Sequence, residues 1–138
     1  MNSKRHKLIL DANIYISAVL FGGKPGEVYL YGLREAYNLF VSPLILEEID
    51  KCLAQKFDWD KKIVNAYIKQ IKRIAHYYNV QNTVSGICRD PKDDHILSLA
   101  VETDADYIVS GDKDLLSLKT FHAIKILDAG KYLEILEQ

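Results

Sequence analysis

Short apolar runs, separated by stretches long enough to form helices, constrain the fold of this chain more than any other feature. Each run is too short for a helix and largely apolar, which is typical of strands buried on both faces of a parallel sheet. The runs cover residues 7–10, 39–41, 107–109 and 123–127, and residues 79–84 also have an extended pattern. We therefore predict an α/β fold with a central parallel sheet of about five short strands, flanked by helices on both faces.

Glycine, proline and capping residues mark the ends of the predicted helices. Gly22 and Gly23 stop a first helix, and Pro25 is tolerated in the first turn of a second. Ser42-Pro43 and Asp90-Pro91 each combine a capping side chain with proline at the first helical position. The predicted helices cover residues 12–21, 25–36, 43–55, 60–77, 91–103, 115–118 and 131–136.

The length and composition predict one folded domain that spans residues 1–138. With 138 residues, of which 49% are hydrophobic, the chain can bury a core without disulfides or structural zinc. The basic start, residues 1–6, is interpreted as a flexible tail. No apolar run approaches the ~20 residues of a membrane span, and no secretory signal follows the basic start. We therefore predict a cytoplasmic protein with no membrane partner.

The charged residues nearly balance, with 18 basic and 19 acidic side chains and a net charge of −1. Such a chain has no general attraction to nucleic acid, so an anionic substrate must be bound by a local group of cations. Lys69, Lys72 and Arg73 lie near one face of the predicted helix 60–77, with Tyr77 and Tyr78 available for stacking. The same pattern is more typical of a solvated helix face.

Acidic residues follow two of the predicted strands. Asp11 comes directly after strand 7–10, and Asp112 follows strand 107–109 after two intervening residues. Ligands of open α/β sheets bind outside the carboxyl ends of the strands, so both carboxylates are candidate site residues. An Asp at a strand-to-helix junction is also a common helix cap, and this alternative stays open for each of them.

Glu48 interrupts the apolar stripe of the predicted helix 43–55. Ile45, Ile49 and Cys52 share one side of this helix at ~100° per residue, and the glutamate falls among them. A carboxylate on a buried face costs several kcal/mol unless it is paired or binds a metal. Glu48 is therefore interpreted as a metal ligand or as half of a salt bridge.

Two adjacent acids near the start of the predicted helix 91–103 are harder to separate. Asp90 suits the N-cap, and Asp93 suits the third helical position of a capping box. Asp94 shares a face with Leu97 and Val101, but Asp93 aligns equally well with Leu97. Periodicity therefore does not decide between Asp93 and Asp94.

Carboxylates that converge without basic neighbours repel one another, and a cation relieves this repulsion. Oxygen ligands alone favour Mg²⁺ or Mn²⁺ over zinc, and these ions commonly keep waters for substrate phosphates. The acids therefore predict a divalent metal site and phosphoryl chemistry.

Four motifs, taken in this order, resemble the PIN-domain family. They are Leu-Asp-Ala-Asn-Ile at 10–14, Ser-Pro-Leu-Ile-Leu-Glu-Glu-Ile at 42–49, Asp-Pro-Lys-Asp-Asp-His-Ile-Leu at 90–97 and Tyr-Ile-Val-Ser-Gly-Asp-Lys-Asp-Leu-Leu at 107–116. Each motif is weak alone, whereas the ordered set is specific and runs from Leu8 to about Asp128. The chain is most similar to the bacterial and archaeal branch described as toxin components of toxin-antitoxin systems.

This resemblance implies a metal-dependent ribonuclease with an acidic site at the carboxyl edge of a compact parallel sheet. Matched to the family motifs, the catalytic and metal-binding acids are Asp11, Glu48, Asp94 and Asp112. The supporting residues are Asn13, Ser110, Asp114 and Asp93. Asn13 and Ser110 are expected to hydrogen-bond a ligating carboxylate or to act as caps, and Asp93 remains the alternative to Asp94.

The implied reaction is metal-assisted hydrolysis of single-stranded RNA, which leaves a 5′-phosphate and a 3′-hydroxyl. One ion, or two ions ~4 Å apart, would activate the attacking water. The implied partners are an RNA substrate, a neutralising protein antitoxin and a second copy of the chain in a homodimer.

Two other functions share some of these features. A haloacid-dehalogenase-like phosphatase also has an Asp after its first strand, but its nucleophile motif needs Asp-x-Asp, and this chain has Asp11-Ala12-Asn13. A catalytically idle PIN-like module would bind RNA or protein without cutting, although retention of all four acids argues against it.

Overall fold

The computed structural model describes residues 5–138 of the chain. Residues 1–4 of the predicted flexible tail lie outside the described part. Arg5 and His6 are described and contact the domain: the Arg5 guanidinium donates a hydrogen bond to the Glu35 carbonyl (3.0 Å), and the His6 and Tyr107 ring centroids lie 5.0 Å apart.

One six-stranded sheet forms the centre of the molecule, which confirms the predicted α/β fold. Its strands, in spatial order β3-β2-β1-β4-β6-β5, are parallel except for β5, which pairs antiparallel with β6. The strands are β1 (Lys7–Leu10), β2 (Asn38–Val41), β3 (Ala75–Tyr77), β4 (Tyr107–Val109), β5 (Thr120–Phe121) and β6 (Ile124–Leu127). The sheet is therefore mixed rather than wholly parallel.

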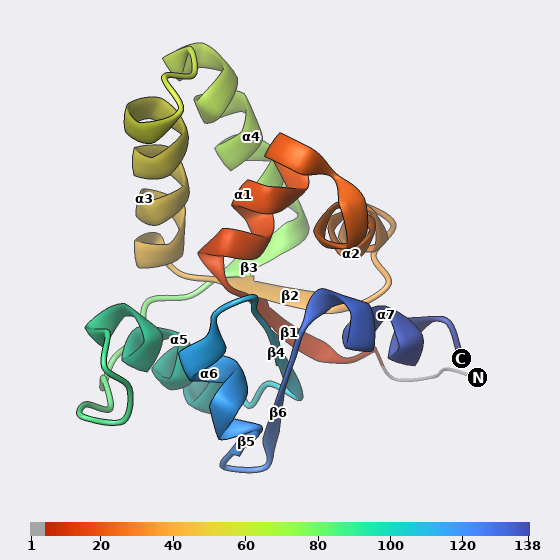
Figure 1. The fold of residues 1–138 in the computed structure, drawn as a ribbon, viewed down its shortest axis with the longest axis vertical. Helices are drawn as coiled ribbons and strands as arrows, with labels where there is room; N and C mark the ends of the chain where they lie inside the picture. Colours follow the sequence, from red (N-terminus) through yellow and green to blue (C-terminus); the bar gives the residue numbers. More distant parts are fainter. Residues whose placement is uncertain (1–4) are drawn as a thin grey trace.

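Helices lie on both sides of this sheet (Figure 1). The helices are α1 (Ala12–Phe21), α2 (Gly23–Leu33), α3 (Pro43–Lys51), α4 (Lys61–Ile74), α5 (Pro91–Glu102), α6 (Lys113–Leu118) and α7 (Ala129–Leu136), and a π-helical turn, Cys52–Lys56, extends α3. Helices α1 to α4 lie together on one side and α5 and α6 on the other. Within residues 5–138, no helix combines the length and the hydropathy needed to cross a bilayer.

The strand order reverses at β1, and this reversal positions the functional site. The chain runs outward from β1 to β2 and β3, then crosses to β4 on the other side of β1. Crossovers between parallel strands are right-handed, so the change of direction moves α5 and α6 to the opposite face from α1 to α4. A crevice forms outside the carboxyl ends of the two strands at such a switch point, here β1 and β4.

The segment after α4 differs from the prediction. The helix expected over residues 60–77 ends at Ile74, and Ala75–Tyr77 form the edge strand β3 beside β2. The extended pattern at 79–84 contains no strand; the Glu102 carboxylate holds this segment by accepting the backbone N–H groups of Gln81 (2.8 Å) and Asn82 (2.7 Å). Pairing with β2 is a long-range interaction, and it overrides the local helical pattern.

The antiparallel strand β5 was absent from the prediction. It reaches β6 through His122 and Ala123, which both have positive φ angles, 51° and 67°. Two consecutive residues with positive φ suit a tight hairpin, but neither is the Gly, Asn or Asp that usually marks such a turn. The sequence therefore carries no clear signal for this hairpin.

The helix predicted over residues 43–55 changes geometry before its end. Regular α3 ends at Lys51, and the following turn is π-helical, with the Phe57 N–H donating to the Cys52 carbonyl (3.1 Å). Ser42 caps the start of α3 as predicted, since its side chain accepts the Ile45 N–H (3.3 Å).

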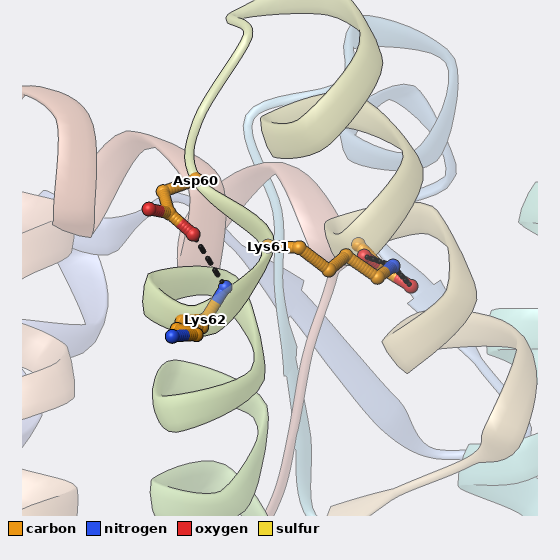
Figure 2. Close-up of polar contacts among 4 residues, drawn as sticks. Asp60, Lys61 and Lys62 are labelled. Atoms are coloured by element: carbon orange, nitrogen blue, oxygen red, sulfur yellow. Dashed lines mark hydrogen bonds and ion pairs between the residues drawn. The ribbon is translucent and has the colours of Figure 1, made fainter.

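Helix α4 begins with a cap and an ion pair that orient it against α3. The Asp60 side chain accepts the Lys62 N–H (2.9 Å), and the Lys61 ammonium contacts both carboxylate oxygens of Asp50 on α3 (2.7 and 2.8 Å), as Figure 2 shows. An exposed pair of this kind contributes only about 0–1 kcal/mol. It therefore orients the two helices more than it stabilises them.

Tyrosines fill much of the core. Tyr15, Tyr29, Tyr37, Tyr67 and Tyr132 are all buried, and their rings contact one another at edge-to-face angles. The Tyr67 hydroxyl donates to the Tyr15 carbonyl over 2.6 Å, which satisfies a polar group inside an apolar environment. These residues pack the core.

Candidate metal centre

The ends of β1 and β4 bring Asp11 and Asp112 to the same crevice. Leu8 to Leu10 of β1 and Val109 of β4 are fully buried, so both strands are anchored up to the site. The buried Ser110 connects the two acids: its hydroxyl donates to Asp11 Oδ2 (2.7 Å) and accepts the Asp112 N–H (3.0 Å). The expected hydrogen bond from Ser110 to a carboxylate is therefore present.

Asp112 also belongs to a group of three carboxylates. Asp93, Asp112 and Asp114 each offer an oxygen, and these oxygens all lie within 4.8 Å of one another. Asp93 comes from the first turn of α5, whereas Asp112 and Asp114 come from the start of α6. Asp112 is also a helix cap, since its Oδ1 accepts the Asp114 N–H over 3.3 Å.

Asp93 carries the clearest sign of charge crowding. Burial raises its pKa to about 8, and a hydrogen bond to Asp112 together with the negative charges of Asp112, Asp11 and Asp90 adds to the rise. A carboxyl group in this environment holds its proton near neutral pH unless a cation takes its place.

Asp94 lies next to Asp93 but has different partners. Its Oδ2 accepts the Gly86 N–H (3.1 Å), and its Oδ1 accepts the Cys88 N–H (2.8 Å). Both carboxylate oxygens therefore anchor the loop before α5. The structure brings Asp93, and not Asp94, into the group with Asp112 and Asp114.

Asp11 occupies the N-cap position of α1, but its side chain forms no capping hydrogen bond. Burial raises the pKa of its carboxyl group, the hydrogen bond from Ser110 opposes the rise, and the charge of Asp112 adds to it. Asp11 is only 7% exposed, and its buried carboxylate accepts a hydrogen bond from the Ser110 hydroxyl.

Glu48 lies half-buried across the crevice, while its neighbour Glu47 is exposed. Burial raises the pKa of Glu48, the Lys92 ammonium lowers it, and the charges of Asp11 and Asp90 raise it. The charges of the neighbouring acids therefore act on the Glu48 carboxylate. Its carboxylate, like that of Asp11, stands outside the group of oxygens that span 4.8 Å.

Two supporting residues also contact neighbouring groups at the edge of the site. Asn13 Oδ1 accepts the Gly111 N–H (3.3 Å), so it holds the backbone beside Asp112 rather than a carboxylate. Asp114 Oδ1 lies 3.3 Å from the Arg89 guanidinium, in an exposed ion pair at the rim of the crevice.

Several residues near the site had no role in the sequence interpretation. Arg89 and Lys92 flank Asp90-Pro91 and approach the acids only because α5 packs beside β1 and β4. Burial raises the pKa of the Cys88 thiol to about 11, with the Asp94 and Asp93 charges adding to the rise, so it is a neutral thiol at neutral pH. Cys88 and Arg89 immediately precede the motif at 90–97 and Lys92 lies within it, which is their only sequence signal.

The donor set suits a hard divalent cation. All the converging ligands are carboxylate oxygens, the ligands that Mg²⁺ and Mn²⁺ prefer. A cation among Asp93, Asp112 and Asp114 would relieve the repulsion that raises the Asp93 pKa, and Asp11 and Glu48 could bind it directly or through waters. The residues therefore fit such an ion.

Comparisons with known proteins agree with this fold. Uncharacterized protein MJ1680 of Methanocaldococcus jannaschii is 32% identical over 142 residues, which cover 98% of this chain and 84% of that protein. A chain in the crystal structure of VapBC2 from Rickettsia felis, bound to a DNA fragment from their promoter, superposes with a TM-score of 0.62. That match covers 87% of this chain and 96% of the other at 12% identity, so it is a likeness of fold.

A sequence profile of the PIN domain matches residues 7–114. The matched span contains β1, β4 and every acid of the candidate metal centre. Because this profile covers well over half of the chain, the chain belongs to the PIN domain family.

Proposed function

We propose that this protein is a metal-dependent ribonuclease that hydrolyses phosphodiester bonds of single-stranded RNA. The observation that carries the proposal is the group formed by Asp93, Asp112 and Asp114, whose oxygens lie within 4.8 Å of one another at the switch point of the sheet. PIN domains are in general metal-dependent nucleases, and family membership leaves the phosphatase alternative without support.

The proposed ligands are Asp93, Asp112 and Asp114, with Asp11 and Glu48 completing the acidic site. Asp11, Glu48 and Asp112 keep the roles that the sequence suggested. We assign the remaining acid of α5 to Asp93, because both oxygens of Asp94 already accept backbone N–H groups.

A bound Mg²⁺ or Mn²⁺ would lower the pKa of a water and stabilise the departing oxygen. The protein's own residues hold the ligands in place. Ser110 fixes the Asp11 carboxylate and the Asp112 backbone with one hydroxyl, and Asn13 fixes the backbone at Gly111. Such outer partners commonly change metal affinity by roughly 10–100-fold when they are removed.

The proposal is tested by incubating the protein with single-stranded RNA in Mn²⁺ and in EDTA, beside Asp11→Asn. We expect cleavage by the parent in Mn²⁺ alone and none by the variant. We also expect the variant to unfold in EDTA at the same or a higher temperature than the parent, because the amide removes a charge from a crowded site. RNA binding without cleavage would instead indicate an idle binding module.

A toxin role for this enzyme requires a neutralising antitoxin, and we propose that the antitoxin covers an apolar cleft between α1, α2 and α4. The cleft has a volume of about 600 Å³, and Ala18, Val19, Leu30 and Leu33 line it. The fold resemblance to a chain of the Rickettsia felis VapBC2 complex supports a partnership of this kind.

Co-purification with the product of the adjacent reading frame tests this part of the proposal. Leu30→Glu should abolish the association and leave RNA cleavage unchanged, because Leu30 lies in the apolar cleft. Light scattering of the protein alone tests the proposed homodimer. In a cell, an enzyme of this kind would act on RNA in the cytoplasm.

A further inference from the structure

A cleft lined by lysines adjoins the acidic site at Glu48. It has a volume of about 430 Å³ and lies between the end of α3, the π-helical turn and the start of α5. Lys51, Lys56 and Lys92 line it together with Glu48. Glu48, which we place in the acidic site, lines this cleft, and the charge of Asp11 acts on its carboxylate.

The charges of this cleft are available to a ligand. Lys51, Lys56 and Lys92 are exposed, and the ion pairs found between residues 5 and 138 involve none of the three. Lys51, Lys56 and Lys92 line this cleft with one acid, Glu48, while Lys51 and Lys92 also line the adjoining cleft that holds Glu47 and Asp50. The cleft is thus a local positive region beside the negative site.

The π-helical turn helps to build this cleft. Hydrogen bonding from residue 57 back to residue 52 adds one residue to the turn, compared with an α-helix. Glu48, Cys52 and Lys56 follow one another at intervals of four residues, which places them on one side of the helix, and all three line the cleft. Single π-helical turns inside α-helices are frequently found at functional sites.

We infer that this lysine-lined cleft binds the phosphates of the RNA strand on one side of the bond that is cut. The inference rests on the proposed ribonuclease function. Because a chain with this net charge does not attract nucleic acid as a whole, the cations that hold the strand must be local. Lys51, Lys56 and Lys92 are the group that lies beside a residue of the acidic site.

The positive face suggested on α4 is a weaker candidate for this role. Lys72 and Tyr77 line a different cleft, between α3 and α4, together with Glu47 and Asp50. The two acids there oppose the binding of a phosphate. None of the proposed metal ligands lines that cleft.

A third cleft supplies a matched control. Lys119, Lys125 and Lys131 line a cleft of about 490 Å³ between α6, β6 and α7, and all three are exposed. It contains three lysines, as the proposed cleft does, but none of the proposed metal ligands. Replacing these lysines changes the total charge by the same amount at another place.

The test measures the binding of a fluorescein-labelled oligouridylate in EDTA, where metal-dependent cutting does not occur. The parent is compared with the triple variants Lys51→Gln/Lys56→Gln/Lys92→Gln and Lys119→Gln/Lys125→Gln/Lys131→Gln by fluorescence anisotropy over a range of salt concentrations. For single strands, each lost phosphate contact reduces the slope of log affinity against log salt by about 0.7. We expect the cleft variant to lose about 2 from this slope and at least ~10-fold in affinity, with the control close to the parent.

Equal weakening of both triple variants, unchanged binding by the cleft variant, or no binding by the folded parent would overturn the inference. Circular dichroism confirms that each variant is folded, and glutamine replaces the ammonium with a neutral polar group. A measurement of RNA cleavage in Mn²⁺ distinguishes a failure of the cleft inference from a failure of the proposed ribonuclease function. A parent that binds through the cleft but does not cut contradicts only the nuclease proposal, whereas a parent that cuts and a cleft variant that binds normally contradict only the cleft.

Discussion

The first turn of α5 has two sides, and each holds a carboxylate in a different environment. Asp93 and Asp94 are both buried, with 8% and 5% of their surfaces exposed. Asp93 faces the acids Asp112 and Asp114, whereas Asp94 accepts two backbone N–H groups of the preceding loop. The comparison teaches that the partners of a buried carboxylate, more than its burial, decide whether it stabilises the fold or requires a cation.

The largest difference between the two sides of α5 is expected when Asp93 is replaced. We expect Asp93→Asn to lower Mn²⁺-dependent RNA cleavage at least ~100-fold and to abolish the rise in Tm that Mn²⁺ produces, because a charged ligand is lost. The matched control, Asp94→Asn, should keep the Mn²⁺-induced rise in Tm and most of the cleavage. Equal losses of cleavage and of the Mn²⁺-induced rise in Tm in both variants would contradict the assignment of the metal ligand to Asp93 rather than Asp94.

The pH dependence of stability should differ between parent and Asp93→Asn in EDTA. Because the pKa of Asp93 is raised from 3.8 to about 8 in the folded protein, the folded state holds a proton that the unfolded state has lost between these values. This carboxyl therefore makes the parent less stable as pH rises from about 4 to 8, by at most about 1.4 kcal/mol per pH unit.

Urea unfolding at several pH values measures this difference. The advantage of Asp93→Asn over the parent should grow with pH across that window. A difference that stays constant with pH would show that Asp93 is not crowded by its neighbours.

Replacement of Asp94 should act on folding rather than on the metal. Asp94→Asn leaves the Gly86 or the Cys88 N–H without its acceptor, and we expect a loss of about 2 kcal/mol in the free energy of unfolding in EDTA. Glu102→Gln is a useful comparison, because Glu102 also accepts two backbone N–H groups but lies nearer to solvent and far from the acids. Its loss should be smaller. A stabilised Asp94→Asn would contradict the anchoring role.

The smallest effect is expected at Ser110, whose hydroxyl contacts Asp11 and the Asp112 backbone beside the Asp93 side of α5. Ser110→Ala removes the donor to Asp11 and the acceptor of the Asp112 N–H, so we expect a loss of about 1 kcal/mol in stability and roughly tenfold in Mn²⁺ affinity. Ser117→Ala, on the exposed side of α6, is the control and should change neither quantity. Metal affinity can be followed by the Mn²⁺ dependence of Tm.

Most of the fold could be predicted because apolar runs, glycines and capping residues mark most of the strands and helices within the local sequence. The apolar runs at 7–10 and 107–109 are the strands β1 and β4 as predicted, and the glycines after Phe21 end α1 where expected. The edge strand Ala75–Tyr77 was missed, because its backbone partners lie in β2, far away in the sequence. Long-range pairing of this kind leaves no periodic signal in so short a segment.

The candidate site was predictable in outline for a related reason. Asp11 and Asp112 stand immediately beyond buried strands, and parallel strands bring such positions to one edge of the sheet. The choice between Asp93 and Asp94 was not predictable, because two adjacent residues border the same apolar face of a helix. The burial of Ile96, Leu97 and Leu99 sets the rotation of α5 about its axis, and that rotation decides which acid meets Asp112.

The sequence by itself determined the α/β class, the acids at the strand ends and the PIN domain motifs, because hydrophobic spacing and short motifs act between near neighbours. Only the tertiary structure decided that Asp93 joins Asp112 and Asp114, and that Lys51, Lys56 and Lys92 line one cleft. These groups come from segments that are distant in the chain. Their meeting depends on how the helices pack on the sheet, which no local pattern encodes.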